Sequence, residues 1–164
     1  MLFRSLKKIP IEDILTPRSV IFALQHNDTV AKVMDEHEDL NFSRIPIYKE
    51  NIDNIIGIVY KDTLLETMAD DNFDKTMADI IDPVDTVFEK QTVESVLNKF
   101  TKTRSHIFIV KDEFGGTTGI VTMEDCIETL LGVEIMDESD EVADMRELAK
   151  DQLRQKRRSE ENGE

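Results

Sequence analysis

Gly119-Ile-Val-Thr-Met-Glu-Asp125 is the stretch that decides the fold, because it has the pattern of a short apolar strand that runs directly into a helix. Thr122 and Asp125 fall where the strand ends and the first helical turn begins. The free backbone N–H groups and the positive dipole end of a helix start suit phosphate or hydroxyl groups. A shorter relative, Gly57-Ile-Val-Tyr-Lys-Asp62, occurs earlier in the chain. The sequence therefore predicts two copies of one unit, with the better-equipped junction in the second copy.

The same order of strands and helices recurs in both halves of the chain. Residues 44–48 and 106–110 are matching strand candidates, and each follows an amphipathic helix that Thr29 or Thr92 can cap. One helical face is repeated in the two copies, at Val30, Val33, Met34 and His37 and again at Val93, Val96, Leu97 and Phe100. We therefore expect an α/β (α+β) fold of two β-α-β-β-α units. A unit of about 60 residues is marginal alone, so the two should pack as a pseudo-twofold pair.

The repeat divides the chain into four parts. We expect a lead-in segment over residues 1–10, a first unit over 11–75 and a second unit over 76–133. Residues 134–164 run from acidic to basic, which complements a helix dipole. This stretch is expected to form a C-terminal helix of about five turns that ends in a disordered tail.

Two local expectations concern the first unit. Residues 19–24 are a strand candidate, because they are mostly apolar and follow a proline that ends the preceding segment. Pro46 has no N–H to donate, so its strand is expected to lie at a sheet edge or to lack a partner at that position.

Charge and hydropathy exclude several classes of protein. The chain has 20 basic and 35 acidic residues, a net charge of −15. This field repels nucleic acid and anionic lipid, so any nucleotide ligand needs local positive groups or a divalent cation. No apolar run approaches the roughly 18–20 residues that span a bilayer, and the N-terminus lacks the apolar core of a signal peptide. A soluble, cytoplasmic chain is expected, although it can be the soluble part of something longer.

Catalytic and metal-binding motifs are absent from the sequence. His26, His37 and His106 are scattered, and no His/Cys cluster suits zinc. No nucleophile–base pairing or phosphate-cradling P-loop is present, so no enzymatic activity is expected. Cys126 is the one cysteine, and a small buried thiol is favoured over a reactive one because no Cys-His arrangement accompanies it.

Four segments resemble a known family. The two units are similar to paired cystathionine-β-synthase (CBS) domains, the regulatory pair also called a Bateman module. More narrowly, the chain resembles the CorC/HlyC hemolysin-related proteins and the cyclin-M metal transport mediators over roughly residues 12–133. The resemblance is carried by Asp13-Ile-Leu-Thr-Pro-Arg18, Ser43-Arg-Ile-Pro-Ile-Tyr48, Asp112-Glu-Phe-Gly-Gly-Thr117 and the Gly119–Asp125 stretch. Members normally carry a transmembrane domain before the CBS pair, and many carry a further C-terminal domain, which is not expected within this sequence.

The resemblance implies a ligand and the residues that hold it. Family members bind AMP, ADP or ATP, the last with Mg²⁺, in the cleft between the two units. Asp125 matches the position that hydrogen-bonds the ribose hydroxyls, and Thr122 matches a hydroxyl near the phosphates. Thr16 and Arg44 match positions of the first unit that complete the same pocket. The chemistry is sensible, because a carboxylate accepts diol protons and an arginine adds charge-assisted hydrogen bonds to phosphate.

Each of these residues also has a structural interpretation. Thr122 and Asp125 have the spacing of a capping box, a role that can coexist with ligand contact. Arg44 can be a surface arginine that pairs with a nearby acid. The first-unit junction departs from the pattern, since Tyr60 stands at the Thr122 position and Asp82 at the Thr16 position. One nucleotide per chain is therefore expected.

Two classes of function remain open on the sequence. The favoured hypothesis is a cytoplasmic regulatory module that binds an adenine nucleotide and controls an attached membrane domain implicated in Mg²⁺ or Co²⁺ transport or efflux. The resemblance also implies a homodimer formed through the CBS pairs. The alternative is a structural dimerisation module whose pocket binds nothing. A lytic toxin has no support, because no amphipathic membrane-inserting segment of the needed length is present.

Overall fold

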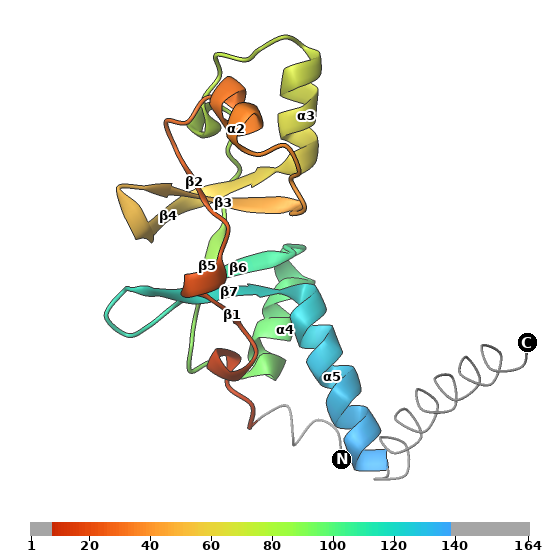
Figure 1. Cartoon of the computed structure of the whole chain (residues 1–164). Helices are drawn as coiled ribbons and strands as arrows, with labels where there is room; N and C mark the ends of the chain where they lie inside the picture. Colours follow the sequence, from red (N-terminus) through yellow and green to blue (C-terminus); the bar gives the residue numbers. More distant parts are fainter. Residues whose placement is uncertain (1–7, 139–164) are drawn as a thin grey trace, which may run out of the picture.

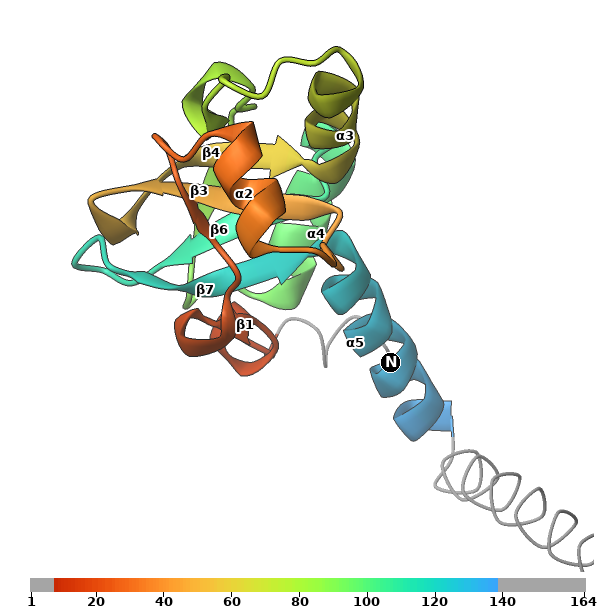
Figure 2. The same cartoon turned by 45° about the horizontal axis from the view of Figure 1, so that its top comes forward.

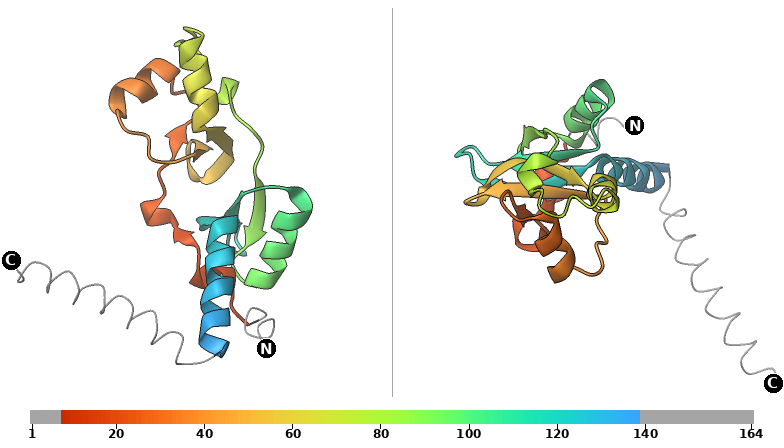
Figure 3. Two further views of the ribbon diagram at one scale, coloured as in Figure 1. Left: turned by 90° about the vertical axis from the view of Figure 1, so that its right-hand side faces the viewer. Right: turned by 90° about the horizontal axis from the view of Figure 1, so that it is seen from above.

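Two similar units are stacked in the computed structural model, which describes residues 8–138, with side chains described as far as residue 132. Figure 1 shows the first unit above the second, with the sheet of each facing the other and its helices turned outward. The view from above in Figure 3 shows the same two layers superposed along their stacking direction. This arrangement confirms the prediction of a mixed α+β pair of duplicated units.

The first unit contains a three-stranded sheet and two helices. In chain order these are β2 (Leu24–Gln25), α2 (Val30–Glu36), β3 (Arg44–Lys49), β4 (Asn51–Tyr60) and α3 (Lys61–Ala69). The strand order is β2-β3-β4, parallel between the first two strands and antiparallel between the last two. The core beneath the sheet is aliphatic and includes Val30, Val33, Ile45, Val59 and Leu64.

The second unit repeats this order. It contains β5 (Asp85–Phe88), α4 (Val93–Thr103), β6 (Ile107–Lys111), β7 (Thr117–Thr122) and α5 (Met123–Glu138). The pair β5–β6 is parallel and the pair β6–β7 is antiparallel, as in the first unit. Its core includes Val93, Val96, Phe100, Phe108 and Val121, and the Phe100 and Phe108 rings stack 4.1 Å apart.

Each unit receives the lead segment of the other. The strand β1 (Thr16–Pro17) precedes the first unit in sequence but pairs with β7 in the second sheet, and the turn η1 (Ile11–Asp13) buries Ile11 in the second core. Conversely, the turn η3 (Met77–Asp79) leads into the second unit but buries Met77 in the core of the first. The two units are therefore interleaved, which joins them by packing as well as by the chain.

Two equivalent glycines allow these crossings. A Cβ at Gly119 would collide with the backbone oxygen of Thr16, and a Cβ at Gly57 would collide with that of Asp82. Asp82 also exchanges both backbone hydrogen bonds with Ile58. The close approach of one backbone to another therefore explains why both copies of the strand–helix junction begin with glycine.

The helical faces predicted from the repeat are confirmed. Thr29 Oγ1 accepts from Lys32 N and Thr92 Oγ1 accepts from Ser95 N, so the two threonines cap α2 and α4. The repeated apolar positions of both helices lie in or against the two cores, except that His37 forms the C-cap of α2.

The strand predicted over residues 19–24 is wrong. Most of it is the turn η2 (Arg18–Val20) and extended chain, and only Leu24 belongs to β2. The segment crosses from β1 in one unit to β2 in the other, and no neighbouring strand pairs with residues 19–23. The apolar content of these residues predicted a strand, but pairing partners decide whether a segment becomes one.

Pro46 lies in a central strand rather than at an edge. β3 lies between β2 and β4, and Pro46 faces Ile58 of β4. The pairing of β2 with β3 covers only Ile47 and Tyr48, so the missing N–H of Pro46 falls where β2 has not yet begun. The predicted gap in pairing is therefore correct, whereas an edge position is not.

The last described helix is longer than the repeat suggests. α5 continues through Gly132 to Glu138, so the boundary predicted at residue 133 falls inside a continuous helix. Residues 139–164, which contain most of the predicted C-terminal helix and tail, lie outside the described part of the chain. Among the residues that the structure describes, no helix combines the length and hydropathy needed to cross a membrane.

Candidate functional site

A cavity between the two units contains all four residues singled out in the sequence. Its volume is about 280 Å³, at the lower end of the range for small-molecule sites. Thr16 and Arg44 line it from the first half of the sequence, and Thr122 and Asp125 line it from the second half. Figure 2 shows the elements concerned, β1, β3, β7 and the start of α5, converging at one side of the paired sheets.

Thr122 and Asp125 form a reciprocal capping box at the start of α5. Thr122 N donates to Asp125 Oδ2 over 3.0 Å, and Asp125 N donates to Thr122 Oγ1 over 3.2 Å. The structural role expected from the spacing is therefore present. In the part of the chain that the structure describes, no donor reaches Asp125 Oδ1, so this oxygen remains available to a ligand in the cavity.

Arg44 supplies positive charge to the cavity wall. It is the first residue of β3 and pairs in register with Tyr60, the last residue of β4. Its Nε atom is buried and, among the described residues, has no hydrogen-bond partner. A buried guanidinium N–H without a partner is unfavourable, and an anionic ligand would satisfy it.

The sequence reasoning missed the apolar lining of the cavity. Phe22 and Phe42 stack with their ring centroids 5.5 Å apart, and Ile107 and Ile120 line the cavity from the second unit. Phe42 is 51% exposed although it is a large aromatic residue, and it lies in the loop between α2 and β3. The sequence did offer one sign of this lining, because Phe42 is a large apolar residue in a polar loop and belongs to no periodic helix face.

The equivalent junction of the first unit is built differently. Tyr60 is the N-cap of α3 but makes no side-chain hydrogen bond to the helix, and Asp62 is exposed. The capping box of the second junction therefore has no counterpart here. This difference agrees with the sequence, in which Tyr60 stands at the Thr122 position and, by the same register, Thr63 stands at the Asp125 position.

The buried thiol predicted at Cys126 is confirmed. Cys126 is completely buried in the core of the second unit. Desolvation, with a smaller contribution from the neighbouring Asp125 carboxylate, raises the pKa of the thiol to about 12. Because the thiolate is the reactive form, this cysteine is a packing residue at neutral pH.

Two β-α-β-β-α units that exchange lead segments and line one shared cavity define a tandem module. The CBS domain family model matches residues 11–70 and 77–132. The chain therefore belongs to the CBS domain family, as a tandem pair homologous to the CorC proteins. CBS domains are in general regulatory and non-catalytic.

Curated proteins of known name have sequences similar to this chain. The magnesium and cobalt efflux protein CorC of Escherichia coli strain K12 is 37% identical over 135 residues, which are 82% of this chain and 46% of that protein. The chain spans less than half the length of the curated relatives it matches.

Solved structures agree with the fold. The CBS domain of a bacterial CNNM/CorC family Mg²⁺ transporter in complex with ATP matches with a TM-score of 0.74 and 33% identity, over 80% of this chain and 93% of that one. A CBS-domain pair from Klebsiella pneumoniae with bound AMP matches with a TM-score of 0.63 and 25% identity, over 76% and 99% of the two chains. Relatives of this fold thus bind adenine nucleotides.

Proposed function

We propose that this chain is a regulatory module that binds one adenine nucleotide between its two CBS units. The observation that carries the proposal is the meeting of Thr16 and Arg44 with Thr122 and Asp125 in one cavity. The ATP and AMP complexes of similar CBS structures support the choice of ligand.

The hydrogen bonds around the four cavity residues leave each of them free to contact a different part of the nucleotide. Asp125 accepts from the ribose hydroxyls through Oδ1, because Oδ2 already accepts from Thr122 N. The Thr122 hydroxyl accepts from Asp125 N and keeps its own proton to donate to the ligand. Arg44 approaches from β3 of the first unit, where its Nε, which has no partner among the described residues, binds a phosphate oxygen. Thr16 lies in β1 beside β7 and adds a further hydroxyl to the cavity.

The apolar part of the cavity suits the base. Phe22 and Phe42 present a stacked aromatic wall, and Ile107 and Ile120 face the cavity from the other unit. A purine is flat and weakly polar on its faces, so it gains by leaving water for such a slot. Mg²⁺, when present, would enter with the triphosphate and reduce the repulsion from the net charge of −15.

Isothermal titration calorimetry with Mg·ATP and with AMP tests the proposal. We expect a stoichiometry of one nucleotide per chain and loss of most of the affinity in Asp125→Ala. Asp62→Ala is the control, because Asp62 is an acid in the first turn of the corresponding helix α3, is exposed and does not line the cavity. No binding by the wild-type protein would favour the ligand-free dimerisation module instead, and equal affinity in wild type and Asp125→Ala would mean that the nucleotide does not bind in this cavity.

The wider role follows from the family. We propose that the module forms a homodimer through its CBS pairs and lies at the cytoplasmic face of the membrane, attached to a transmembrane domain. The name of the E. coli relative, an efflux protein for magnesium and cobalt, supports transport of Mg²⁺ or Co²⁺ by that domain. Nucleotide binding would then alter transport only if one arrangement of the two units binds more tightly than another.

A further inference from the structure

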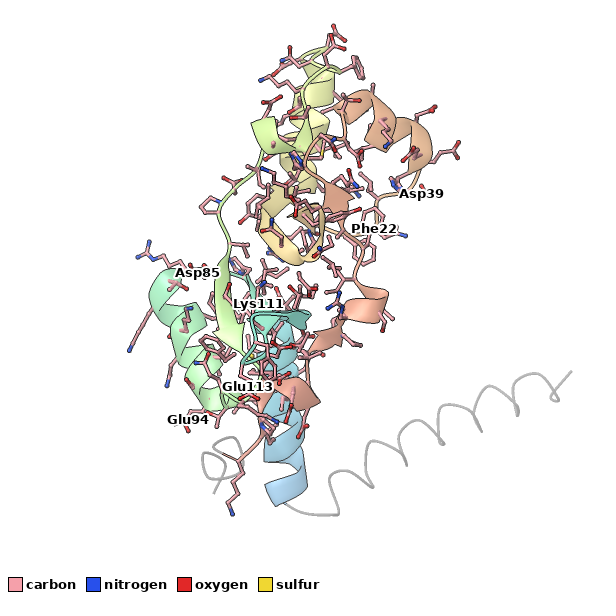
Figure 4. The ribbon with its side chains drawn as sticks, turned by 90° about the vertical axis from the view of Figure 1, so that its left-hand side faces the viewer. Phe22, Asp39, Asp85, Glu94, Lys111 and Glu113 are labelled. Carbon is pink, nitrogen blue, oxygen red and sulfur yellow. The ribbon has the colours of Figure 1, made fainter. Side chains whose placement is uncertain are left out.

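A set of hydrogen bonds joins the two units at the end opposite the cavity. The cavity lies where β3 begins and β7 ends, whereas these bonds lie at the β3–β4 and β6–β7 hairpins. We call the group of Arg18, Asp53, Lys111 and Thr117 the clasp. Figure 4 looks onto this end of the molecule and shows Lys111 on the side of the second unit that faces the first.

Asp53 is the centre of the clasp. Its Oδ1 atom accepts from Arg18 Nη1 over 2.7 Å and from Thr117 N over 2.9 Å, and its backbone oxygen accepts from Lys111 Nζ. Arg18 Nη1 also donates to the Thr117 backbone oxygen over 3.1 Å. One carboxylate of the first hairpin thus binds the second hairpin both directly and through Arg18.

The clasp is not required by the fold, because the pseudo-symmetric position lacks it. Gly57 and Gly119 are equivalent in the repeat, and by the same register the counterpart of Asp53 is Gly115, which carries no side chain. The counterpart of Thr117 is Ile55. The carboxylate therefore links the hairpins from the first unit alone, which makes the pair asymmetric.

Arg18 connects the clasp to the wall of the cavity. Thr16 lies two positions before it, and Val20 and Ile21 follow shortly after it; all three line the cavity. Arg18 begins the turn η2, whose backbone closes with Ile21 N donating to Arg18 O. The position of this wall segment is thus fixed at one point by the side chain that bonds to Asp53.

We propose that the clasp holds the two hairpins together and sets the width of the cavity, so that clasp formation and nucleotide binding strengthen each other. This coupling rests on the nucleotide-binding function proposed above. A ligand that prefers the closed arrangement must stabilise the clasp by the same factor by which the clasp raises ligand affinity. The clasp would therefore be the part of the pair that reports an occupied cavity.

Amide hydrogen exchange on the protein without nucleotide tests the clasp itself. We expect Thr117 N–H to exchange faster in Asp53→Ala than in wild type, because its acceptor is removed, and the residues 16–22 to exchange faster in Arg18→Ala. Lys32→Ala is the matched control: it removes an ion pair of similar length, 2.8 Å to Asp28, within the first unit. Equal exchange at these positions in wild type and both clasp variants would overturn the clasp.

Mg·ATP calorimetry on the same variants tests the coupling. Arg18→Ala and Asp53→Ala should each weaken binding by about two- to fivefold, the range expected for a half-exposed ion pair. The loss of affinity in the double variant should be smaller than the sum of the two single losses, because both single variants remove the Arg18–Asp53 ion pair. Lys32→Ala should bind as wild type does.

The outcomes separate the two proposals. Wild-type affinity in the clasp variants, or losses that add in the double variant, would overturn the coupling while leaving nucleotide binding intact. A wild-type protein that binds no nucleotide would overturn the proposed function and the coupling with it. The exchange experiment would then still support or overturn the clasp as a structural link.

Discussion

Thr122 and Asp125 combine two roles in one geometry. Their reciprocal hydrogen bonds of 3.0 and 3.2 Å satisfy the first turn of α5 and fix both side chains at the cavity. α4 begins with the same kind of cap, Thr92, which lies outside this cavity. Comparing the two threonines therefore distinguishes the effect of helix capping from that of the proposed contact between Thr122 and a ligand.

Replacing each threonine by alanine tests this separation. Thr122→Ala and Thr92→Ala each remove the oxygen that accepts from a backbone N–H 3.2 Å away. Each should lower the free energy of unfolding in urea by about 1 kcal/mol. Only Thr122→Ala should also weaken Mg·ATP binding in calorimetry. Equal loss of affinity in both variants would show that Thr122 acts through stability alone.

At the scale of elements, the crossing of β1 over β7 depends on Gly119. The Thr16 backbone oxygen occupies the position that a Cβ at Gly119 would take, and the equivalent crossing places the Asp82 oxygen against Gly57. The backbone oxygens cannot move without breaking the pairing of the lead segments. Both glycines are therefore required by packing against a second backbone rather than by an unusual φ.

Alanine substitutions at three glycines measure this requirement. Gly119→Ala and Gly57→Ala should each reduce the free energy of unfolding by about 1–3 kcal/mol, the usual penalty of forcing atoms into a filled space. Gly132→Ala is the control, because a Cβ there meets nothing within 4 Å and the residue lies inside α5. It should raise stability by up to about 1 kcal/mol. Urea denaturation of the three variants would contradict the crossing geometry if Gly119→Ala proved as stable as Gly132→Ala.

Elements with a periodic apolar face could be predicted, and the segments between units could not. The faces of α2 and α4 are set by local spacing, so Val33 and Val96 were correctly assigned to the cores. Thr16 and Pro17 pair with β7 of the other unit, and residues 18–22 cross between the units without a strand partner, so no local pattern carries that information. The same holds for Phe42, whose place in the cavity depends on Phe22 reaching it from the crossing segment.

At the scale of the whole molecule, the duplicated fold is symmetric in its backbone and asymmetric in its chemistry. The repeat and the family resemblance together indicated the four cavity residues, which the structure brings into one cavity. The clasp was missed, because Asp53 and Arg18 are far apart in sequence and neither belongs to a motif that marks a contact between units. Contacts of this kind arise only when the two units are assembled.

The titration of Asp53 provides a test of that assembly. The hydrogen bond from Thr117 N–H has the largest effect and lowers the pKa of the Asp53 carboxyl below its ordinary value. Desolvation, the next largest effect, opposes it, and the hydrogen bond and charge of Arg18 add to the lowering. A carboxyl whose pKa is lowered by folding stabilises the folded state fully above the ordinary pKa of about 3.9. That contribution is lost as the pH falls through the lowered pKa.

We therefore expect Asp53→Asn to have a lower urea midpoint than wild type at pH 7, with a gap that stays constant down to about pH 5 and closes as the pH falls below the ordinary aspartate pKa of about 3.9. Asparagine keeps an acceptor oxygen but carries no charge, so the gap reports the charged clasp rather than packing. Glu113→Gln, an exposed acid of the β6–β7 hairpin, should show no such pH-dependent gap. A gap that is absent at pH 7 would mean that the Asp53 carboxylate does not hold the two hairpins together. A gap that persists unchanged at pH 2 would mean the same, because the carboxyl is protonated there and no longer carries the charge that the clasp needs.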